Sequence, residues 1–138
     1  MSIIEKMKVK FNLKIKVKEI SKSWGMDDVT REYFIKGSEK HGEFKEWWNN
    51  GQLTWHCFYK NGKPDGESKS WWINGQLRSC CFFKNGKLEG EYKSWHSDGK
   101  IHRHHFMKNG LYHGKYKSWY EDGNLFQSCV YEDGVLIG

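Results

Sequence analysis

The glycines of this 138-residue chain recur with a period of 24 residues. Thirteen of the fifteen glycines fall into three columns that keep this spacing without a slip. The columns are Gly42, Gly66, Gly90, Gly114 and Gly138; Gly51, Gly75, Gly99 and Gly123; and Gly62, Gly86, Gly110 and Gly134. A fixed period of a few tens of residues is typical of arrays in which one supersecondary unit packs on the next. The chain is therefore predicted to be a repeat array.

The period divides the chain into three parts. Residues 1–17 do not fit the repeat, and residues 18–41 form a degenerate copy in which Lys18 and Ser38 replace glycines. Four good copies follow, at residues 42–65, 66–89, 90–113 and 114–137.

Each repeat carries the signals of a β-hairpin. Asn-Gly or Asp-Gly dipeptides divide it, and these pairs are favoured in two-residue turns because both central positions of a type I′ turn need positive φ. The predicted turn glycines are Gly51, Gly62, Gly75, Gly86, Gly99, Gly110, Gly123 and Gly134. The chain has no alanine, one proline and 17% aromatic residues. This composition favours strands over helices.

A two-residue loop at Asn50–Gly51 predicts how the flanking strands pair. Trp48 would lie opposite Leu53, and Phe44 opposite Cys57. One face of the sheet then collects aromatic side chains, while the other mixes lysines with aromatic residues. Because neither face is cleanly polar, the sheet is expected to be strongly curved or to be covered by a partner.

Two surfaces of the predicted sheet are candidate binding sites. The aromatic interaction face comprises Phe44, Trp48, Trp55, Tyr59, Trp72, Phe83, Tyr92, Tyr116 and Tyr120. The opposite face carries a tryptophan ladder beside a lysine ladder, formed by Trp47, Trp71, Trp95 and Trp119 and by Lys45, Lys69, Lys93 and Lys117. Exposed aromatic rows rimmed by charge mark protein or membrane contacts. The alternative is that both ladders only cover the sheet, with cation–π contacts between them.

These columns resemble the MORN repeat in its 24-residue variant. The pattern Gly-Glu-x-Lys-Ser-Trp-x-x-Asn/Asp-Gly-x-Leu-x-x-x-x-Phe-x-Lys-Asn-Gly-x-x-x-Gly occurs at residues 66–90 and, with Ile101 at the leucine position, at 90–114. The likeness covers residues 42–138 and, weakly, 18–41. Ser68 in place of an aromatic residue and His96 in place of tryptophan depart from it, and indicate either a groove or sequence drift.

The resemblance implies an all-β fold, an elongated single-layer antiparallel sheet of stacked β-hairpins. It also implies a scaffold or partner-binding role, with no enzyme activity and no cofactor in the repeats. Phospholipid binding and homodimerisation are implied for several members. Relatives occur in bacteria, some of them as antitoxins, in eukaryotes and in large DNA viruses.

Residues 6–18 alternate polar and apolar side chains, which predicts an amphipathic N-terminal edge strand. Its basic side chains are Lys6, Lys8, Lys10, Lys14, Lys16 and Lys18. Residues 1–41 hold ten basic and six acidic residues (+4), whereas 42–138 hold thirteen and eleven (+2). Lysines on an edge strand blunt unwanted pairing, so a cap is one interpretation. The others are a strip that binds an anionic membrane or phosphate, and a strand that pairs with a second chain.

Cysteines and histidines predict neither a disulfide nor a metal site. Cys57, Cys81 and Cys129 occupy equivalent positions, and such positions two strands apart are ~9.6 Å from each other. That exceeds the ~7 Å limit for a disulfide, and no Cys-x-x-Cys zinc motif is present. His102 and His104 would lie on one face as solvated strand histidines. Free thiols, with no signal peptide or membrane helix expected, predict a cytoplasmic protein or one peripheral to the membrane.

The balance of +6 raises the question of nucleic acid. Only three residues are arginine, and repeat lysines alternate with Glu43, Glu67 and Glu91, so nucleic-acid binding is not expected. No catalytic residue is predicted. We expect a non-enzymatic, homodimeric module that binds a protein partner through the aromatic face. The alternatives are a peripheral membrane adaptor, which binds anionic phospholipid through the basic strand and repeat lysines, and an antitoxin-like protein.

Overall fold

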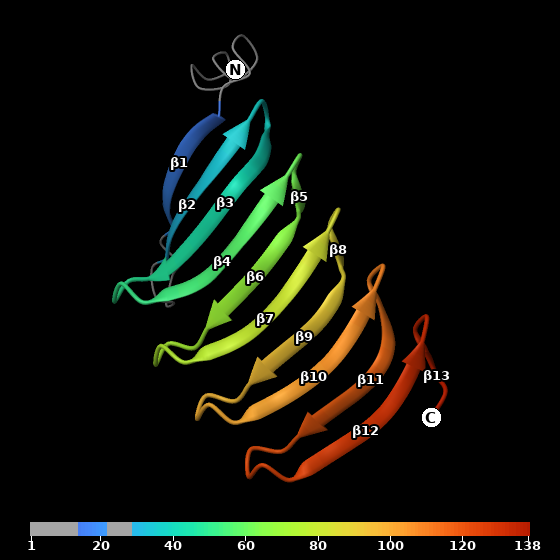
Figure 1. Cartoon of the computed structure of the whole chain (residues 1–138). Helices are drawn as coiled ribbons and strands as arrows, with labels where there is room; N and C mark the ends of the chain where they lie inside the picture. Colours follow the sequence, from blue (N-terminus) through green and yellow to red (C-terminus); the bar gives the residue numbers. More distant parts are fainter. Residues whose placement is uncertain (1–13, 22–28) are drawn as a thin grey trace.

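The computed structural model describes residues 14–21 and 29–138, and this part of the chain consists of strands and turns without a helix. The strands form one antiparallel 13-stranded sheet with the order β1-β2-β3-β4-β6-β7-β9-β10-β11-β12-β13, in which β5 and β8 pair with β4 and β7 (Figure 1). The predicted all-β class and single-layer sheet of stacked hairpins are confirmed. None of the described residues forms a helix able to cross a membrane.

Each good repeat contributes one long hairpin and a short return segment, which is a separate strand (β5, β8 and β13) except after β10, where it is the beginning of β11. The strands are β1 (Lys14–Ser21), β2 (Val29–Lys36), β3 (Glu39–Trp48), β4 (Leu53–Lys60), β5 (Lys63–Pro64), β6 (Gly66–Trp71), β7 (Leu77–Lys84), β8 (Lys87–Leu88), β9 (Gly90–Trp95), β10 (Ile101–Lys108), β11 (Leu111–Trp119), β12 (Leu125–Glu132) and β13 (Val135–Leu136).

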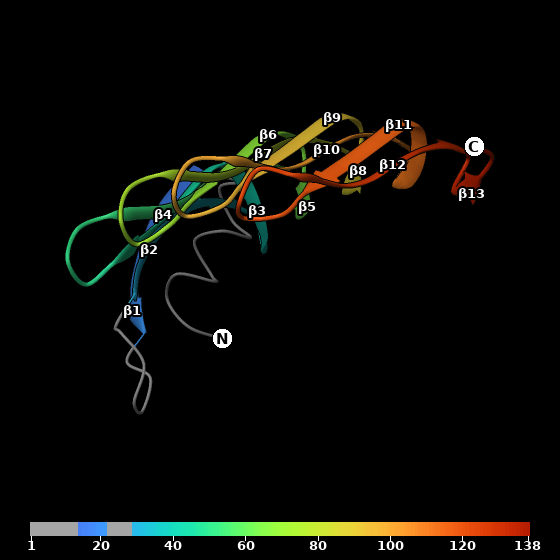
Figure 2. The same cartoon turned by 90° about the horizontal axis from the view of Figure 1, so that it is seen from below.

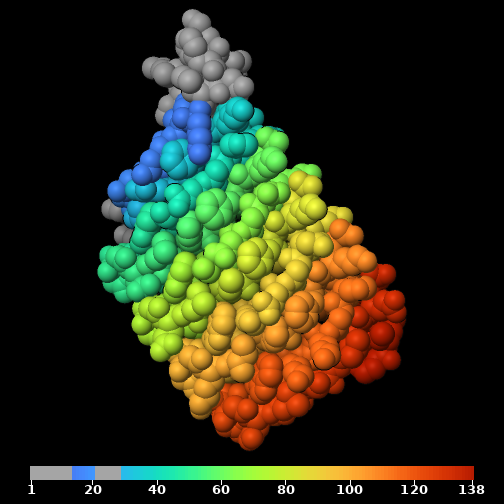
Figure 3. Space-filling view, in the orientation of Figure 1, coloured from blue at the N-terminus to red at the C-terminus, as the bar shows by residue number. Residues whose placement is uncertain are grey.

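The sheet is one layer thick and bends along its length. Figure 2 shows it nearly edge-on, with β1 turned out of the plane of the C-terminal strands. The space-filling view shows the repeats as parallel diagonal bands, each bordering only the bands before and after it (Figure 3). This is the quasi-one-dimensional packing of a repeat array.

The first turn of each repeat (residues 49–51, 73–75, 97–99 and 121–123) differs from the predicted two-residue loop. Gly51 N–H donates to the Trp48 carbonyl (3.0 Å), and Trp48 N–H donates to the Gln52 carbonyl (2.9 Å). The loop therefore has three residues, and only its glycine has positive φ. The prediction of a type I′ turn at Asn50–Gly51 was wrong, because the loop is a type I turn followed by a glycine bulge.

The type I′ turns occur instead at the second turn of each repeat (residues 61–62, 85–86, 109–110 and 133–134). Asn61 and Gly62 have φ of 50° and 79°, and the flanking Lys60 and Lys63 are paired. The turns also bond to one another, because Gly62, Gly86, Gly110 and Gly134 each donate a backbone hydrogen bond of 2.8–2.9 Å to the preceding unit. All eight predicted turn glycines have positive φ.

A β-bulge in the second strand of each repeat sets the pairing. Trp47 is opposite Leu53, but Glu46 is opposite Trp55, which leaves Thr54 unpaired. The predicted pairing of Trp48 with Leu53 was therefore wrong. The predicted pairing of Phe44 with Cys57 is confirmed, because the bulge cancels the shift that the three-residue loop introduces. The equivalent bulged residues are Arg78, His102 and Phe126.

Candidate interaction surface

One face of the sheet, here called the aromatic face, carries the residues with the least exposed side chains. Register places Tyr33, Phe44, Cys57, Ser68, Cys81, Tyr92, His105, Tyr116 and Cys129 in one row across the sheet. Only four apolar residues of the described chain are buried: Ile35, Phe44, Cys57 and Cys81. Within residues 14–21 and 29–138, the row has no second sheet or helix to pack against.

Phe44 is the centre of the N-terminal part of this row. Its side chain is 2% exposed, and its ring lies 5.0 Å from that of Trp55 and 5.9 Å from that of Tyr59. The Lys40 ammonium lies 4.9 Å from the Phe44 ring centroid, and it also approaches Tyr33 and Tyr59. This cluster brings together three of the predicted face residues.

A stack of rings replaces the phenylalanine cluster towards the C-terminus. His105 lies between Tyr92 at 4.4 Å and Tyr116 at 5.4 Å, both nearly parallel to it, and Tyr112 meets it edge-on. Burial lowers the pKa of His105 to about 4, with Arg103 and His104 adding to the effect. The imidazole is thus a neutral member of an aromatic stack.

The other predicted aromatic residues line the borders of the face. Tyr59 and Phe83 lie near the second turns, where they pair with Pro64 and Leu88. Trp48, Trp72 and Tyr120 lie at the first turns. Trp72 and Tyr120 each pack on the bulged residue of their own repeat. Arg78 lies 4.6 Å over the Trp72 ring, and Phe126 lies 4.9 Å from Tyr120.

The two departures from the repeat pattern have structural partners. Ser68 accepts a hydrogen bond from Trp55 Nε1 at 3.0 Å, so a short polar side chain accommodates the indole of the preceding repeat. His96 Nε2 lies 3.1 Å from the Trp119 carbonyl. Trp72 makes the equivalent contact, because its Nε1 donates to the Trp95 carbonyl at 3.0 Å. His96 therefore preserves a contact between repeats.

The opposite face, here called the charged face, is built from ion pairs. Lys45 pairs with Glu43 at 2.9 Å, Lys69 with Glu67 at 2.8 Å and Lys93 with Glu91 at 3.1 Å. His56 and His104 add a second contact to Glu43 and Glu91. The hydrogen bonds from Lys45 and Lys93 lower the pKa of Glu43 and Glu91, respectively. The hydrogen bond to Glu67 raises the pKa of Lys69.

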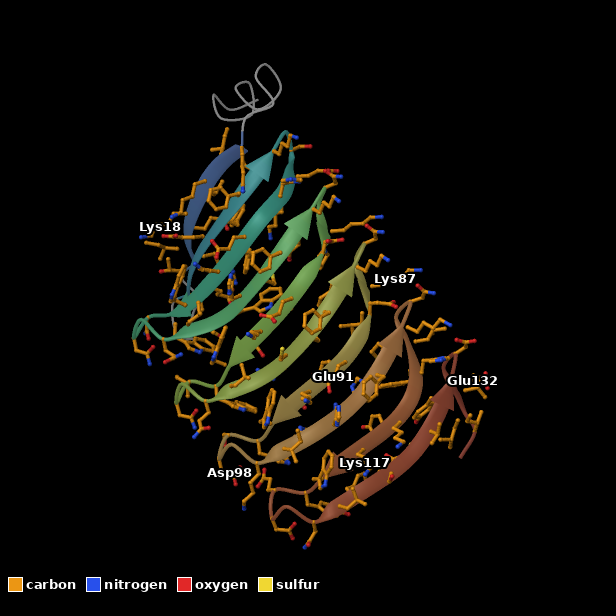
Figure 4. All side chains as sticks on the ribbon, in the orientation of Figure 1. Lys18, Lys87, Glu91, Asp98, Lys117 and Glu132 are labelled. Atoms are coloured by element: carbon orange, nitrogen blue, oxygen red, sulfur yellow. The ribbon has the colours of Figure 1, made fainter. Side chains whose placement is uncertain are left out.

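The tryptophan ladder shares the charged face with these lysines but is half-buried. Trp47, Trp71, Trp95 and Trp119 pair with Leu53, Leu77, Ile101 and Leu125. Three of the ladder lysines reach glutamates instead of indole rings, and in the last repeat Lys115 stands where those glutamates stand. Figure 4 shows Glu91 and Lys117 on the strands, between Lys87 at the second-turn side and Asp98 at the first-turn side.

The predicted basic strand lies partly outside the described residues, which exclude Lys6, Lys8 and Lys10. Lys14, Lys16 and Lys18 lie in β1, which pairs with β2 of the same chain. Lys16 makes an ion pair with Glu32 at 2.7 Å, and Lys14 lies 4.3 Å from the Phe34 ring centroid. One edge of β1 is therefore hydrogen-bonded to β2 of the same chain.

The cysteines are free thiols, and burial raises the pKa of Cys57 to about 12 and that of Cys81 to about 11. Such thiols are poor nucleophiles near neutral pH. The bulge separates His102 from His104, so the expectation that they share a face was wrong. His102 stacks on His96 at 4.3 Å, while His104 bonds Glu91. Residues 14–21 and 29–138 contain no group of three or more side chains suited to a metal.

The bulges also bring to the aromatic face residues that the sequence did not single out. Arg78 and Phe126 would lie on the charged face in an unbroken alternation, but the extra residue re-aims each of them. With Arg103, Ser94 and Ser118 they border two hollows near the first turns, with volumes of about 340 and 260 Å³. The signal that could have revealed these residues is that a three-residue loop would shift the strand pairing by one residue in every repeat, which a bulge must then correct.

At the C-terminal edge of the described sheet, exposed apolar side chains flank a segment of β12 that is unpaired on its outer side. In earlier repeats the equivalent strands are covered, since Trp55–His56 pairs with β6 and Ser79–Cys80 pairs with β9. Gln127–Ser128 of β12 has no such neighbour within the described residues. Several apolar side chains nearby are highly exposed: Leu125 52%, Phe126 60%, Val135 64%, Leu136 57% and Ile137 58%.

The repeats match the family model of the MORN repeat variant at residues 40–61, 64–85, 88–109 and 112–133. The chain belongs to this family. MORN repeats are generally non-enzymatic modules known from protein-interaction and membrane-binding contexts. No curated protein sequence matches the chain significantly.

Proposed function

We propose that this MORN-repeat protein is a non-enzymatic interaction module, which binds a protein partner through its aromatic face and forms a homodimer through its C-terminal edge. The single observation that carries the proposal is the open layer itself. A sheet of this size has only four buried apolar residues among those described, and large aromatic side chains remain uncovered on it. Exposed apolar surface of this kind is typical of protein–protein contacts.

The exposure of the aromatic face rises along the repeats. Phe44 is 2% exposed and His105 5%, whereas Tyr112 is 36% and Tyr120 52% exposed. Tyrosine and phenylalanine are enriched at interfaces because they bury a large rigid area at low entropic cost. A partner that covers Tyr112, Tyr116 and Tyr120 would therefore bury the aromatic surface that the chain leaves most exposed.

The C-terminal edge favours a second copy of the chain as its occupant. β12 offers unpaired backbone groups together with exposed Leu125 and Phe126, and β13 adds exposed Val135 and Leu136. At the other end of the sheet, β1 carries exposed lysines, which disfavour strand pairing. Antiparallel pairing of β12 with β12 of a second copy gives a closed two-fold contact between like edges.

Size-exclusion chromatography with light scattering tests the dimer. The expected mass is twice the 16.5 kDa of the chain. Phe126→Lys and Leu136→Lys should reduce it towards one chain by placing charge in the apolar contact. Phe82→Lys is the matched control, because Phe82 is 42% exposed on the charged face. A mass near 16.5 kDa for the unchanged protein at micromolar concentration would reject the dimer.

Cross-linking of partners in cell extract, followed by mass spectrometry, tests the aromatic face. Tyr120→Lys should remove a specific partner, whereas Phe82→Lys should keep it. Equal capture by both variants would show that the partner does not use the aromatic face.

A further inference from the structure

The larger hollow of the aromatic face lies between residues 66–89 and 90–113 and has a volume of about 340 Å³. A row of hydroxyl and guanidinium groups crosses its floor, because register aligns Ser70, Ser79, Ser94 and Arg103 on adjacent strands. Adjacent strands are ~4.8 Å apart, so neighbouring members of this row lie close enough to contact one small ligand. Trp72 forms a wall, held by its hydrogen bond to the Trp95 carbonyl.

Ser94 is the unexplained member of this row. Its side chain is 7% exposed, and its Oγ has no hydrogen-bond partner among the described residues. Ser70 and Ser79 bond each other at 2.6 Å, so they do not satisfy it. A buried hydroxyl without a partner destabilises the fold. A ligand in the hollow would supply the missing acceptor.

Two arginines flank Ser94, and no carboxylate among the described residues forms an ion pair with either. Arg103 is directly opposite Ser94, and Arg78 reaches the hollow from the bulge next to Ser79, where it stacks on Trp72. Burial raises the pKa of the Tyr92 phenol, while Arg103, the Ser94 hydroxyl and Arg78 oppose that effect. Tyr92 is therefore a polar group close to the Ser94 hydroxyl, although no hydrogen bond of ordinary geometry with a described residue satisfies Ser94 Oγ. Both guanidinium groups act on this phenol, which lines the hollow.

We infer that this hollow binds a soluble phosphate monoester. Two guanidinium groups match its two negative charges, and guanidinium donates to phosphate oxygens in a bidentate manner. Ser94 can donate to a third oxygen, while Trp72 and Tyr92 line the hollow beside these donors. A carboxylate, with one charge and two oxygens, would leave part of this donor set unused. The inference rests on the proposed function, because it names the chemistry that the aromatic face recognises.

A membrane is the less suitable source of the phosphate. The repeat lysines that would hold a bilayer lie on the charged face, and Lys45, Lys69 and Lys93 are already paired with glutamates. A bilayer on that face cannot reach Arg78 or Arg103 on the other. The occupant is therefore a free phosphate ester or a phosphorylated side chain.

Isothermal titration calorimetry with phenyl phosphate tests the inference, with a phosphotyrosine peptide to distinguish a side chain from a free ester. Saturable binding is expected, and benzoate should bind at least about tenfold more weakly because it carries one charge. Equal affinity for benzoate would overturn selectivity for phosphate. An absence of saturable binding at millimolar phenyl phosphate would overturn the site, while a dimeric mass and a retained partner would leave the proposed function standing.

Matched variants locate the binding. Arg103→Gln and Ser94→Ala should each weaken phenyl phosphate binding about tenfold. Lys117→Gln removes the same charge from the charged face and should leave binding unchanged. Ser94→Ala should also raise the melting temperature of the free protein, a gain that mere loss of structure would not give. Equal weakening by Lys117→Gln, or binding only to phosphatidic acid vesicles and not to phenyl phosphate, would overturn the inference.

Discussion

The two faces of the sheet come from the same strands but differ in how their polar groups are satisfied. On the charged face, Glu43, Glu67 and Glu91 bond lysine or histidine side chains within the first three good repeats. On the aromatic face, Ser94 Oγ, His105 Nδ1 and Ser118 Oγ are buried without a hydrogen-bond partner among the described residues. The glutamates of the charged face thus have partners within their own hairpins, whereas the aromatic face keeps buried polar groups without a partner among the described residues.

Truncation of Phe44 should give the largest difference between the faces. Phe44→Ala removes a ring that contacts Tyr33, Trp55 and Tyr59, and should lower the free energy of unfolding by about 3–5 kcal/mol. Phe82→Ala on the charged face should change it by less than about 1 kcal/mol, because Phe82 is 42% exposed. Urea denaturation measures both.

Hydrogen exchange would show where the Phe44→Ala effect falls. Loss of protection should concentrate in β2, β3 and β4, since repeats contact only their neighbours. Equal loss in β12 would contradict this independence of the repeats.

Acid should destabilise the protein through the aromatic face before it affects the charged face. The pKa of His105 is about 4 in the fold and near 6.5 when unfolded, so the unfolded state binds more protons between these values. The free energy of unfolding should therefore fall as pH drops from 6.5 to 4, by about 3 kcal/mol in all. The groups that face His105 are Arg103, His104, Tyr92, Tyr112 and Tyr116.

Thermal denaturation across this pH range checks the effect. His105→Phe should remove most of the slope and leave a smaller contribution from His102, whose pKa burial also lowers. His104→Gln, on the charged face, should retain the slope. The glutamate pairs act in the same direction but at lower pH: the lowered pKa of Glu91 gives stability that is lost as pH falls below 4.5. A slope of undiminished size in His105→Phe would assign the acid sensitivity to another group.

Removal of the Ser118 hydroxyl should stabilise the fold. Ser118 is 5% exposed and its Oγ is unsatisfied, so Ser118→Ala should raise the free energy of unfolding by about 1 kcal/mol. Ser128→Ala, at an exposed position, should change it by less than about 0.5 kcal/mol. A loss of stability in Ser118→Ala would mean that the hydroxyl has a partner in solution.

The smallest effect is expected from the ion pairs of the charged face. Lys93→Gln breaks the contact with Glu91, yet both side chains are partly exposed, so the loss should be at most about 0.5 kcal/mol at low salt. Lys117→Gln, without a glutamate in the matching position, should show less dependence on salt. A loss as large as that of Phe44→Ala would erase the difference between the faces.

Repeat length and turn chemistry could be predicted from the sequence, but the turn types could not. The same Asn-Gly dipeptide forms both turns, and its hydrogen bonds distinguish them. In the first turn, the Asn74 side chain accepts from the Gln76 N–H (3.0 Å). In the second, the Asn85 N–H donates to Asp65, twenty residues earlier (3.1 Å). The second contact depends on the stacking of repeats, which no local pattern contains.

The aromatic face could be predicted in outline because strand alternation holds in the middle of each hairpin. Phe44, Tyr92 and Tyr116 lie in the row that alternation gives them. The hollow could not be predicted, since it depends on the bulge that re-aims Arg78. Loss of alternation over a single residue is enough to move a charge from one face to the other.

The bonded row of second turns has a mechanical consequence. Backbone hydrogen bonds join these turns along one long side of the sheet, whereas the first turns are joined through side chains such as Trp72 and Asn74. When the sheet bends, we expect the side joined through backbone hydrogen bonds to deform least. The first turns on the other side should then move apart the most. The hollow around Ser94 lies on the compliant side, so flexing of the array changes its width.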